Sequence, residues 1–226
     1  MNMNGSMVNH LIRKDWYFNR IPIIFYLVVG VVALALTAVD NTTTFYVGSL
    51  LLIVVLLTAG IHIVMATVIY ERKEQTLPFV MSLPVSFMEY TTAKILANLT
   101  TFLLPWGMLI LGTWLVIKNS AGIPNGLIPF AVLVLLQILV GYCLMLSLAL
   151  VTESETWTII VLVLSNLFLN YFMYTVSHIP AMEAAMLGET IIWNQEAILI
   201  LLAQIIVILL AIGLTFYFQS RKKDFL

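Results

Sequence analysis

Charged residues are scarce in this chain, and their scarcity limits the kind of protein it can be. Asp, Glu, Lys and Arg make up 9% of its 226 residues, whereas 62% are hydrophobic. Soluble domains have roughly 25% charged and about 45–50% apolar residues, so the composition predicts an integral membrane protein. The net charge is −1, and the longest basic run is Arg221–Lys223. A nucleic-acid partner is not expected, because it would require a larger basic surface.

Cysteine and the common catalytic motifs are also lacking. Cys143 is the single cysteine, so the chain has no internal disulfide, and its apolar neighbours indicate a small core residue. No G-x-x-x-x-G-K-[ST] phosphate-binding loop is present, since Gly107 and Gly112 are followed by Thr113 and Trp114. Neither H-E-x-x-H nor G-x-S-x-G occurs. We therefore expect a chain that is not an enzyme and binds no metal, ATP or other cofactor itself.

Long apolar runs, by contrast, are abundant. A helix needs about 20 mostly apolar residues to cross a bilayer. Six stretches meet this requirement, at about residues 21–39, 45–70, 95–117, 127–151, 157–176 and 197–218. The sequence therefore predicts an all-α integral membrane protein with a single transmembrane domain over residues 1–226.

The residues before the first span have an amphipathic pattern. Residues 7–20 carry apolar side chains three to four positions apart, whereas Arg13, Lys14 and Asn19 are expected mostly on another face. This pattern is typical of a helix lying in the membrane interface, here with Trp16 and Tyr17 at the level of the headgroups. We therefore predict an interfacial helix at residues 7–20, in contact with membrane lipid.

The distribution of Lys and Arg predicts the orientation in the membrane. An even number of spans puts both termini on one side, and that side collects nine of the ten Lys and Arg residues. Only Lys118 falls on the other side. Because segments rich in Lys and Arg stay in the cytoplasm, we expect a multi-pass protein of the plasma membrane (the inner membrane of a bacterium) with both termini cytoplasmic.

The largest charged loop lies between the second and third spans. It reads ERKEQTLPFVMSLPVSFMEY, from Glu71 to Tyr90, and begins with four charged residues. The part from Leu77 to Met88 is too short to cross a bilayer and too apolar for a solvated linker. An apolar patch with a charged rim is typical of a docking surface. We therefore expect a short helix here that binds a partner.

This loop and the order of the spans resemble those of the ABC-2 type permease family, the membrane subunits of ATP-driven exporters. The matching residues are Glu71, Glu74, Thr76, Leu77, Ser82, Leu83, Pro84, Val85, Ser86 and Lys94. The chain departs from the family pattern at Gln75, Pro78 and Phe87, where a glycine, an acid and a base are usual. The resemblance implies an interfacial N-terminal helix, a cytoplasmic coupling helix after the second span, and a re-entrant outer hairpin, for which Ser177–Gln195 is the candidate.

The resemblance also implies a mechanism and partners. Two such permeases pair, as identical or different subunits, and each coupling helix docks into a separate ATP-binding-cassette ATPase subunit, which holds ATP and Mg²⁺. The docking residues expected here are Thr76, Leu77, Phe79, Val80, Leu83, Pro84, Val85 and Ser86. Apolar anchors suit a groove, and proline reduces the entropy lost on docking. Because the spans carry few charges, we expect an amphiphilic substrate such as a peptide, an antibiotic or a lipid-like molecule.

A few polar residues inside the spans are candidates for a substrate path. His62 is the one ionisable residue near the middle of a span, where such residues are often functional. Its alternative role is a neutral side chain bonded to a neighbouring helix. Asn166, Asn170 and Tyr174 are spaced four apart and share a face of the fifth span. They either line a substrate path or form hydrogen bonds between helices.

Two other classes of function remain open at this point. A secondary carrier would favour internal repeats and buried acids at mid-membrane, which the sequence does not show. An intramembrane enzyme would have to be centred on His62. On the outer side, His178, Glu183, Glu189 and Glu196 follow no spacing typical of metal ligands.

Overall fold

The computed structural model describes residues 5–73, 86–120 and 122–221. Within these residues the chain forms helices and no strands, and six of the helices are long and apolar enough to cross a membrane. The prediction of an all-α membrane protein with six spans is therefore confirmed. The helices are α1 (Gly5–Thr37), α2 (Thr42–Val64), η1 (Met65–Ile69), α3 (Tyr70–Lys73), α5 (Phe87–Asn119), α6 (Leu127–Thr152), α7 (Glu155–Ser177), α8 (Pro180–Met186) and α9 (Gln195–Arg221).

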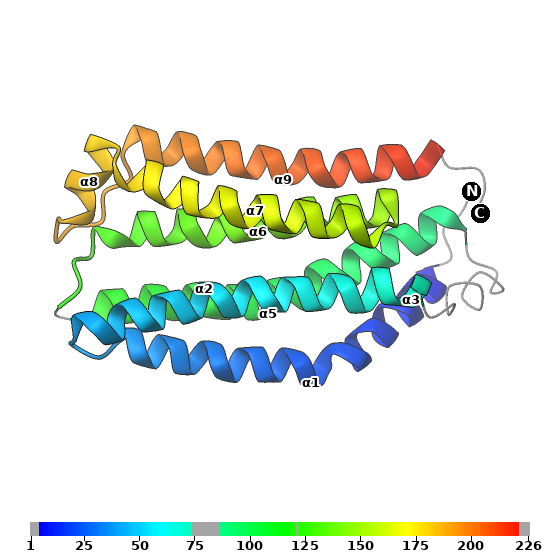
Figure 1. Ribbon diagram of the computed structural model, residues 1–226, viewed down its shortest axis with the longest axis horizontal. Helices are drawn as coiled ribbons and strands as arrows, with labels where there is room; N and C mark the ends of the chain where they lie inside the picture. Colours follow the sequence, from blue (N-terminus) through cyan, green and yellow to red (C-terminus); the bar gives the residue numbers. More distant parts are fainter. Residues whose placement is uncertain (1–4, 74–85, 121, 222–226) are drawn as a thin grey trace.

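Two of these helices are longer than the predicted spans. α1 runs without interruption through residues 7–20 and the first span, and it bends along its length (Figure 1). Pro22 lies inside α1, and a proline ring both removes a hydrogen bond and crowds the preceding turn, which bends a helix. α5 likewise joins the residues before the third span to the span itself. It begins at Phe87, and the hydroxyl of its N-cap, Ser86, forms a capping box with the Glu89 carboxylate.

The long helices are arranged in two groups of three (Figure 1). In one group α1 packs against α2 and α5, and in the other α6 packs against α7 and α9. α6 joins the groups because it also contacts α2 and α5. Within its most apolar stretch α6 is the most buried of the six spans, whereas α7 and α9 are the least buried. Lipid or a second subunit must therefore cover most of α7 and α9.

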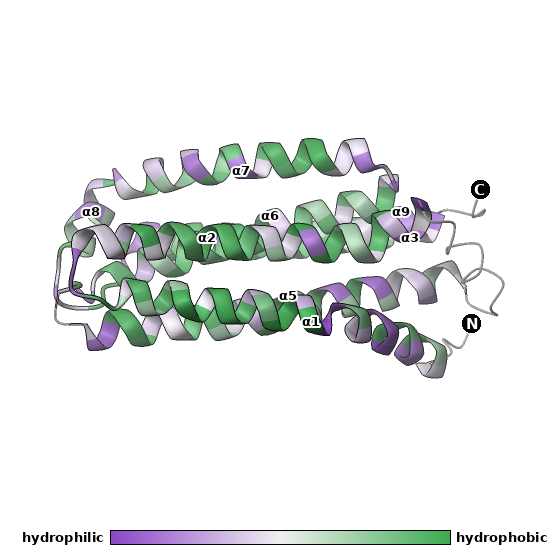
Figure 2. Cartoon of the chain, turned by 60° about the horizontal axis from the view of Figure 1, so that its bottom comes forward, coloured by the Kyte–Doolittle hydropathy of each residue, from purple (hydrophilic) through white to green (hydrophobic). Residues whose placement is uncertain are grey.

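The two ends of the bundle differ in their connections. One end of the bundle, which we call the α3 end, contains α3, the start of α1, the first turn of α5 and the end of α9 (Figure 1). The other end carries the turn between α1 and α2, the connection between α5 and α6, and the short helix α8; we call it the α8 end. Apolar residues dominate between the two ends, and hydrophilic residues gather toward them (Figure 2). This distribution is the one expected of a bundle that spans a bilayer.

Several polar side chains inside the bundle form hydrogen bonds between helices. The Gln204 side chain of α9 donates to the Gln137 side-chain oxygen of α6 at 2.9 Å and to the Leu133 carbonyl at 3.0 Å. The Trp106 indole of α5 donates to the Leu135 carbonyl at 2.8 Å. Buried polar groups are costly unless they are paired, so these bonds help fix the positions of α5 and α9 on α6.

The segment between α7 and α9 contains a short helix and an extended stretch. α8 starts with Pro180 in its first turn, where a missing N–H costs little. The Gly126 N–H donates to the Gly188 carbonyl at 2.9 Å, which ties the segment to the start of α6. That Ser177–Gln195 forms a re-entrant hairpin in the membrane stays a prediction.

Candidate functional site

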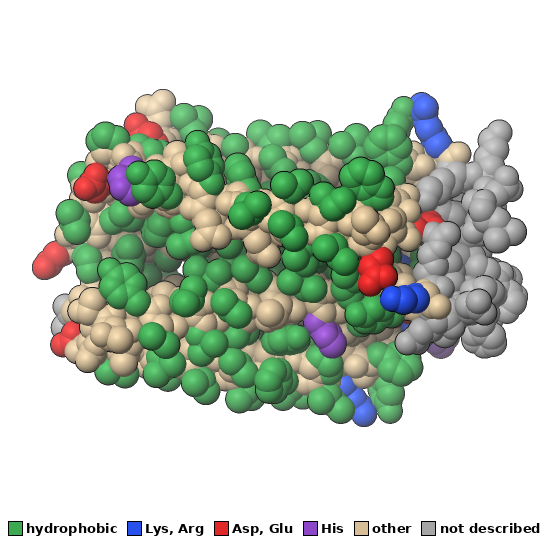
Figure 3. Space-filling model, viewed as in Figure 1, with side chains coloured by type: hydrophobic (Ala, Val, Ile, Leu, Met, Phe, Trp, Pro, Cys, Tyr) green, Lys and Arg blue, Asp and Glu red, His purple; other side chains and the backbone are tan. Residues whose placement is uncertain are grey.

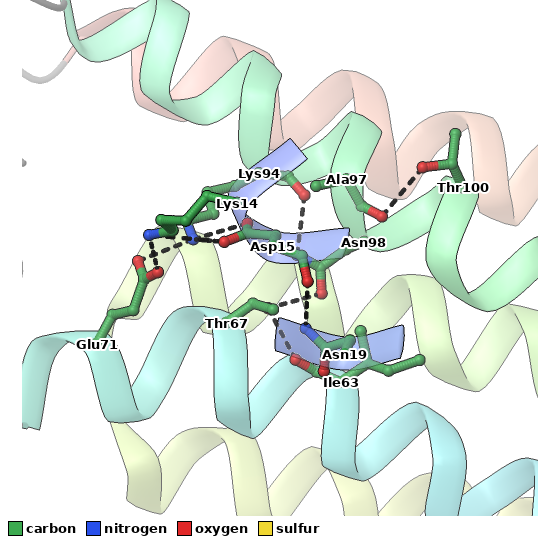
Figure 4. A network of polar contacts seen from close by, with 10 residues as sticks. All are labelled: Lys14, Asp15, Asn19, Ile63, Thr67, Glu71, Lys94, Ala97, Asn98 and Thr100. Carbon is green, nitrogen blue, oxygen red and sulfur yellow. Dashed lines mark hydrogen bonds and ion pairs between the residues drawn. The ribbon is translucent and has the colours of Figure 1, made fainter. Parts of the chain in front are cut away.

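Four charged side chains from three helices meet near the α3 end (Figure 4). Lys94 of α5 places its Nζ 2.8 Å from Asp15 Oδ2 of α1 and 2.8 Å from Glu71 Oε2 of α3. Lys14 of α1 places its Nζ 2.5 Å from Glu71 Oε1 and 3.6 Å from Asp15 Oδ1. Each ammonium group therefore lies within ion-pair distance of both carboxylates. We call these four residues the charge cluster.

Burial makes the charge cluster an unusual feature. The Lys94 side chain is 1% exposed, that of Asp15 is 4% exposed, and that of Glu71 is 12% exposed. A charge removed from water is tolerated only when it is paired and hydrogen-bonded. Because two ammonium groups face two carboxylates, the cluster is formally neutral, and this balance explains how Lys94 can be buried.

Neutral polar residues extend the cluster toward the middle of the bundle. The Asn98 side chain donates to the Lys94 carbonyl at 2.9 Å and accepts from the Thr67 hydroxyl at 2.9 Å. The Tyr142 hydroxyl of α6 donates to the Asn98 carbonyl at 2.9 Å. On α1, the Asn19 side chain donates to the Asp15 carbonyl at 2.8 Å. The network thus links α1, η1, α5 and α6.

The π-helical turn η1 lies beside this network. Such turns are rare and occur often at functional sites. One additional residue in a turn rotates all later side chains by about 100° around the helix axis, given 3.6 residues per turn. The single O–H of Thr67 in η1 has two acceptors within hydrogen-bonding distance, the Ile63 carbonyl at 2.7 Å and the Asn98 side-chain oxygen at 2.9 Å. η1 therefore decides which side of its helix presents Glu71 to Lys94.

The charge cluster contains residues from both sides of the segment that is predicted to form the coupling helix. Glu71 lies just before residues 74–85, and Lys94 lies two turns after Ser86, the N-cap of α5. Seven of the predicted docking residues fall outside the described residues: Thr76, Leu77, Phe79, Val80, Leu83, Pro84 and Val85. The eighth, Ser86, accepts a hydrogen bond from the Glu89 N–H at 3.3 Å.

The four predicted path residues lie in different surroundings and do not form one site. Asn166 lines a narrow cleft of about 30 Å³ between α2, α5, α6 and α7, with room for about two water molecules. His62 is exposed, and its ring lies edge-on to Tyr26 with centroids 5.9 Å apart. Asn170 is exposed and donates to the Asn166 carbonyl at 2.9 Å. Tyr174 is 65% exposed. Only Asn166 therefore belongs to a cleft between the two groups of helices.

The segment predicted to be interfacial has one face packed on α5. The Trp16 indole donates to the Thr100 hydroxyl at 3.0 Å, while the Tyr17 side chain is 60% exposed. Its buried residues are Val8, Leu11, Asp15 and Asn19. The sequence contained a signal for the buried Asp15, since this acid follows Val8 by seven positions and Leu11 by four. These spacings put an acid on the apolar face, and the sequence interpretation missed it.

No group of three or more His, Cys, Asp and Glu residues that could hold a metal ion occurs in the described part of the chain. Comparison with models of known protein families, with curated proteins and with solved structures finds no match. The features of the chain that bear on its function are therefore the resemblance in the loop and the geometry of the charge cluster.

Proposed function

We propose that this chain is the membrane subunit of an ATP-driven ABC exporter, paired with a second permease subunit. A separate ATPase subunit binds the coupling helix within residues 76–86, and the spans carry an amphiphilic substrate. The observation that carries this proposal is the charge cluster. Glu71 and Lys94, two residues that match the permease pattern on either side of that helix, lie 2.8 Å apart and share contacts with α1.

The cluster suggests how movement of the ATPase reaches the spans. A force on the coupling helix acts on α3 and α5 at its two ends. Buried ion pairs resist separation because a broken pair leaves an uncompensated charge in a medium of low dielectric constant. α1, α3 and α5 would then move together, and the group α1, α2, α5 would shift relative to α6, α7 and α9. The cleft beside Asn166 lies between these groups and would open with that shift.

The distribution of charge supports a cytoplasmic position for the α3 end. Nine of the ten Lys and Arg residues belong to it or to the segments next to it, and Lys118 is the exception. Figure 3 shows the Lys and Arg side chains of this face toward the same end. Under the positive-inside rule, both termini and the coupling helix face the cytoplasm of a plasma membrane or bacterial inner membrane. There they are accessible to an ATPase subunit.

The alternative of an enzyme or carrier centred on His62 has weaker support. His62 is exposed, and the ring contact found for it among the described residues is with Tyr26. Proton transfer would require an acid or base within hydrogen-bonding reach of the imidazole.

The first test is purification of the tagged chain in mild detergent from cells that express it with its neighbouring genes. We expect an ATP-hydrolysing subunit to co-purify. Leu83→Asp should abolish this co-purification, because a carboxylate in an apolar groove has no partner. Ile192→Asp is the matched control: it adds the same charge at an exposed aliphatic residue of the α8 end and should leave the complex intact. Normal assembly and export with Leu83→Asp would refute the docking proposal.

A second test concerns the substrate path. We expect Asn166→Leu to lower efflux of a fluorescent amphiphile from cells several-fold, because it adds bulk and removes a polar group in the narrow cleft. Asn170→Leu, one turn along the same helix but exposed, is the matched control and should leave efflux unchanged. If Asn170→Leu has the larger effect, the path follows the exposed face of α7 instead.

A further inference from the structure

A second and larger cleft opens at the α8 end. Its volume is about 830 Å³, within the range of about 300–1,000 Å³ typical of sites for small molecules. It is lined by the turn between α1 and α2, the end of α5, the connection from α5 to α6, and the end of α8. In the space-filling view this end of the bundle is hollowed between the two groups of helices (Figure 3). The cleft is separate from the charge cluster, which lies near the opposite end.

The wall of this outer cleft is mainly apolar and open to its surroundings. Val39 is 50% exposed, Tyr46 68%, Leu115 51% and Leu187 77%. These residues come from three separate segments and face one cleft. Apolar side chains gathered in a concave surface at the edge of a membrane protein favour a ligand with an apolar body.

One carboxylate lies in this apolar wall. Among the described residues that line the cleft, Asp40 is the one that carries a formal charge. Its carboxylate rests against Gly122, where an added Cβ would collide with the Asp40 Oδ1 atom. Lys118, the one Lys or Arg of this end in the described part of the chain, lies over the Trp114 ring with its Nζ 4.8 Å from the ring centroid. Among the described residues, none forms an ion pair or a hydrogen bond with the Asp40 carboxylate.

The surroundings of the cleft are acidic as well. The α8 end carries Asp40, Glu183, Glu189 and Glu196 against Lys118 alone, a formal net charge of −3. Figure 3 shows acidic side chains at this end of the molecule. A field of this sign raises the local concentration of cations and opposes anions. It therefore disfavours phospholipids, whose phosphate groups would approach Asp40.

We propose that the outer cleft binds a cationic amphiphile, with its cationic group against the Asp40 carboxylate and its apolar body along Val39, Tyr46, Leu115 and Leu187. The binding itself does not depend on an ATPase subunit. That this ligand is the exported substrate, and that the cleft is where it leaves the bundle, rests on the proposed function.

The test uses the purified chain in nanodiscs of zwitterionic lipid, without ATP or a partner. A photoreactive dodecyltrimethylammonium derivative is cross-linked, and the labelled residues are mapped by mass spectrometry. We expect labels on the residues of the cleft wall. Unlabelled dodecyltrimethylammonium should compete, whereas neutral dodecyl maltoside should compete poorly. Asp40→Asn should weaken labelling about fivefold, as expected for loss of a partly exposed ion pair.

Two further variants make the test specific. Glu196→Gln removes the same charge from the same end of the bundle, but Glu196 does not line the cleft, so labelling should fall much less than in Asp40→Asn. Gly122→Val keeps every charge but displaces the Asp40 carboxylate, so it should weaken labelling like Asp40→Asn. Equal losses in Asp40→Asn and Glu196→Gln, or equal competition by dodecyl maltoside, would overturn the proposal. If the labelling test fails but an ATPase subunit still co-purifies with the chain, the proposal of an exporter holds and its substrate belongs to another chemical class.

Discussion

Lys94→Met is expected to lower the free energy of unfolding by about 3–5 kcal/mol, the cost typical of breaking a buried ion pair from one side. Lys94 is 1% exposed and lies 2.8 Å from both Asp15 and Glu71. Without its ammonium group, Lys14 alone would face two carboxylates, so the cluster would carry an unbalanced negative charge away from water. Unfolding of the purified chain by SDS in mixed micelles, followed by tryptophan fluorescence, measures the change.

Two controls separate charge balance from a general effect of the substitution. Lys73 pairs with Glu155 at 3.2 Å, but these side chains are 64% and 42% exposed, so Lys73→Met should change the stability by less than about 1 kcal/mol. Asp15→Asn combined with Lys94→Met should recover much of the loss, because the remaining pair, Lys14 and Glu71, is neutral. If Lys94→Met is no more destabilising than Lys73→Met, the cluster does not hold α1 to α3 and α5.

Gly48→Val is expected to separate α1 from α2 and to lower the free energy of unfolding by about 3 kcal/mol, the upper part of the range for overpacking. A Cβ at Gly48 would lie 2.7 Å from the Ala33 carbonyl oxygen and 2.7 Å from the Thr37 backbone nitrogen. These are backbone atoms of the facing helix, so no side-chain rotation can relieve the collision. The same unfolding measurement in mixed micelles checks this prediction.

Gly213→Val is the matched control for this effect. Gly213 also lies inside a span, in α9, but an added Cβ would meet no described heavy atom within 4 Å. Both variants put a β-branched residue into a helix, so their intrinsic helix propensities change equally. A similar loss of stability in both would show that propensity, rather than contact between α1 and α2, causes the effect.

Part of the candidate site could be predicted from the sequence. Glu71 and Lys94 belonged to the loop pattern, and the structure brings them together. Asp15 was not predicted, although its place on the apolar face of residues 7–20 was a usable signal. The predicted path residues, in contrast, do not come together in one site. Asn166 and His62 were both predicted path residues inside spans, but Asn166 lines a cleft, whereas His62 is exposed and its ring contacts Tyr26.

The sequence by itself determined the class of protein and the number of spans. An apolar run of about 20 residues identifies a span from its own composition, because a bilayer requires every spanning segment to be apolar and helical. For the same reason the short polar turns between the spans could be predicted from the sequence. The long helix α1 was not predicted: the sequence analysis expected an interfacial helix at residues 7–20 and a separate span from residue 21, whereas the structure joins them into one helix that contains Pro22.

Only the tertiary structure decided which distant residues meet. Lys94 pairs with Asp15 across 79 positions in the chain, and no local pattern in either segment specifies the other. Their pairing depends on the packing of α1 against α5 and on the rotation that η1 imposes on Glu71. The outer cleft likewise forms where three connections come together. Ion pairs and clefts are products of distances between helices, which composition and periodicity do not determine.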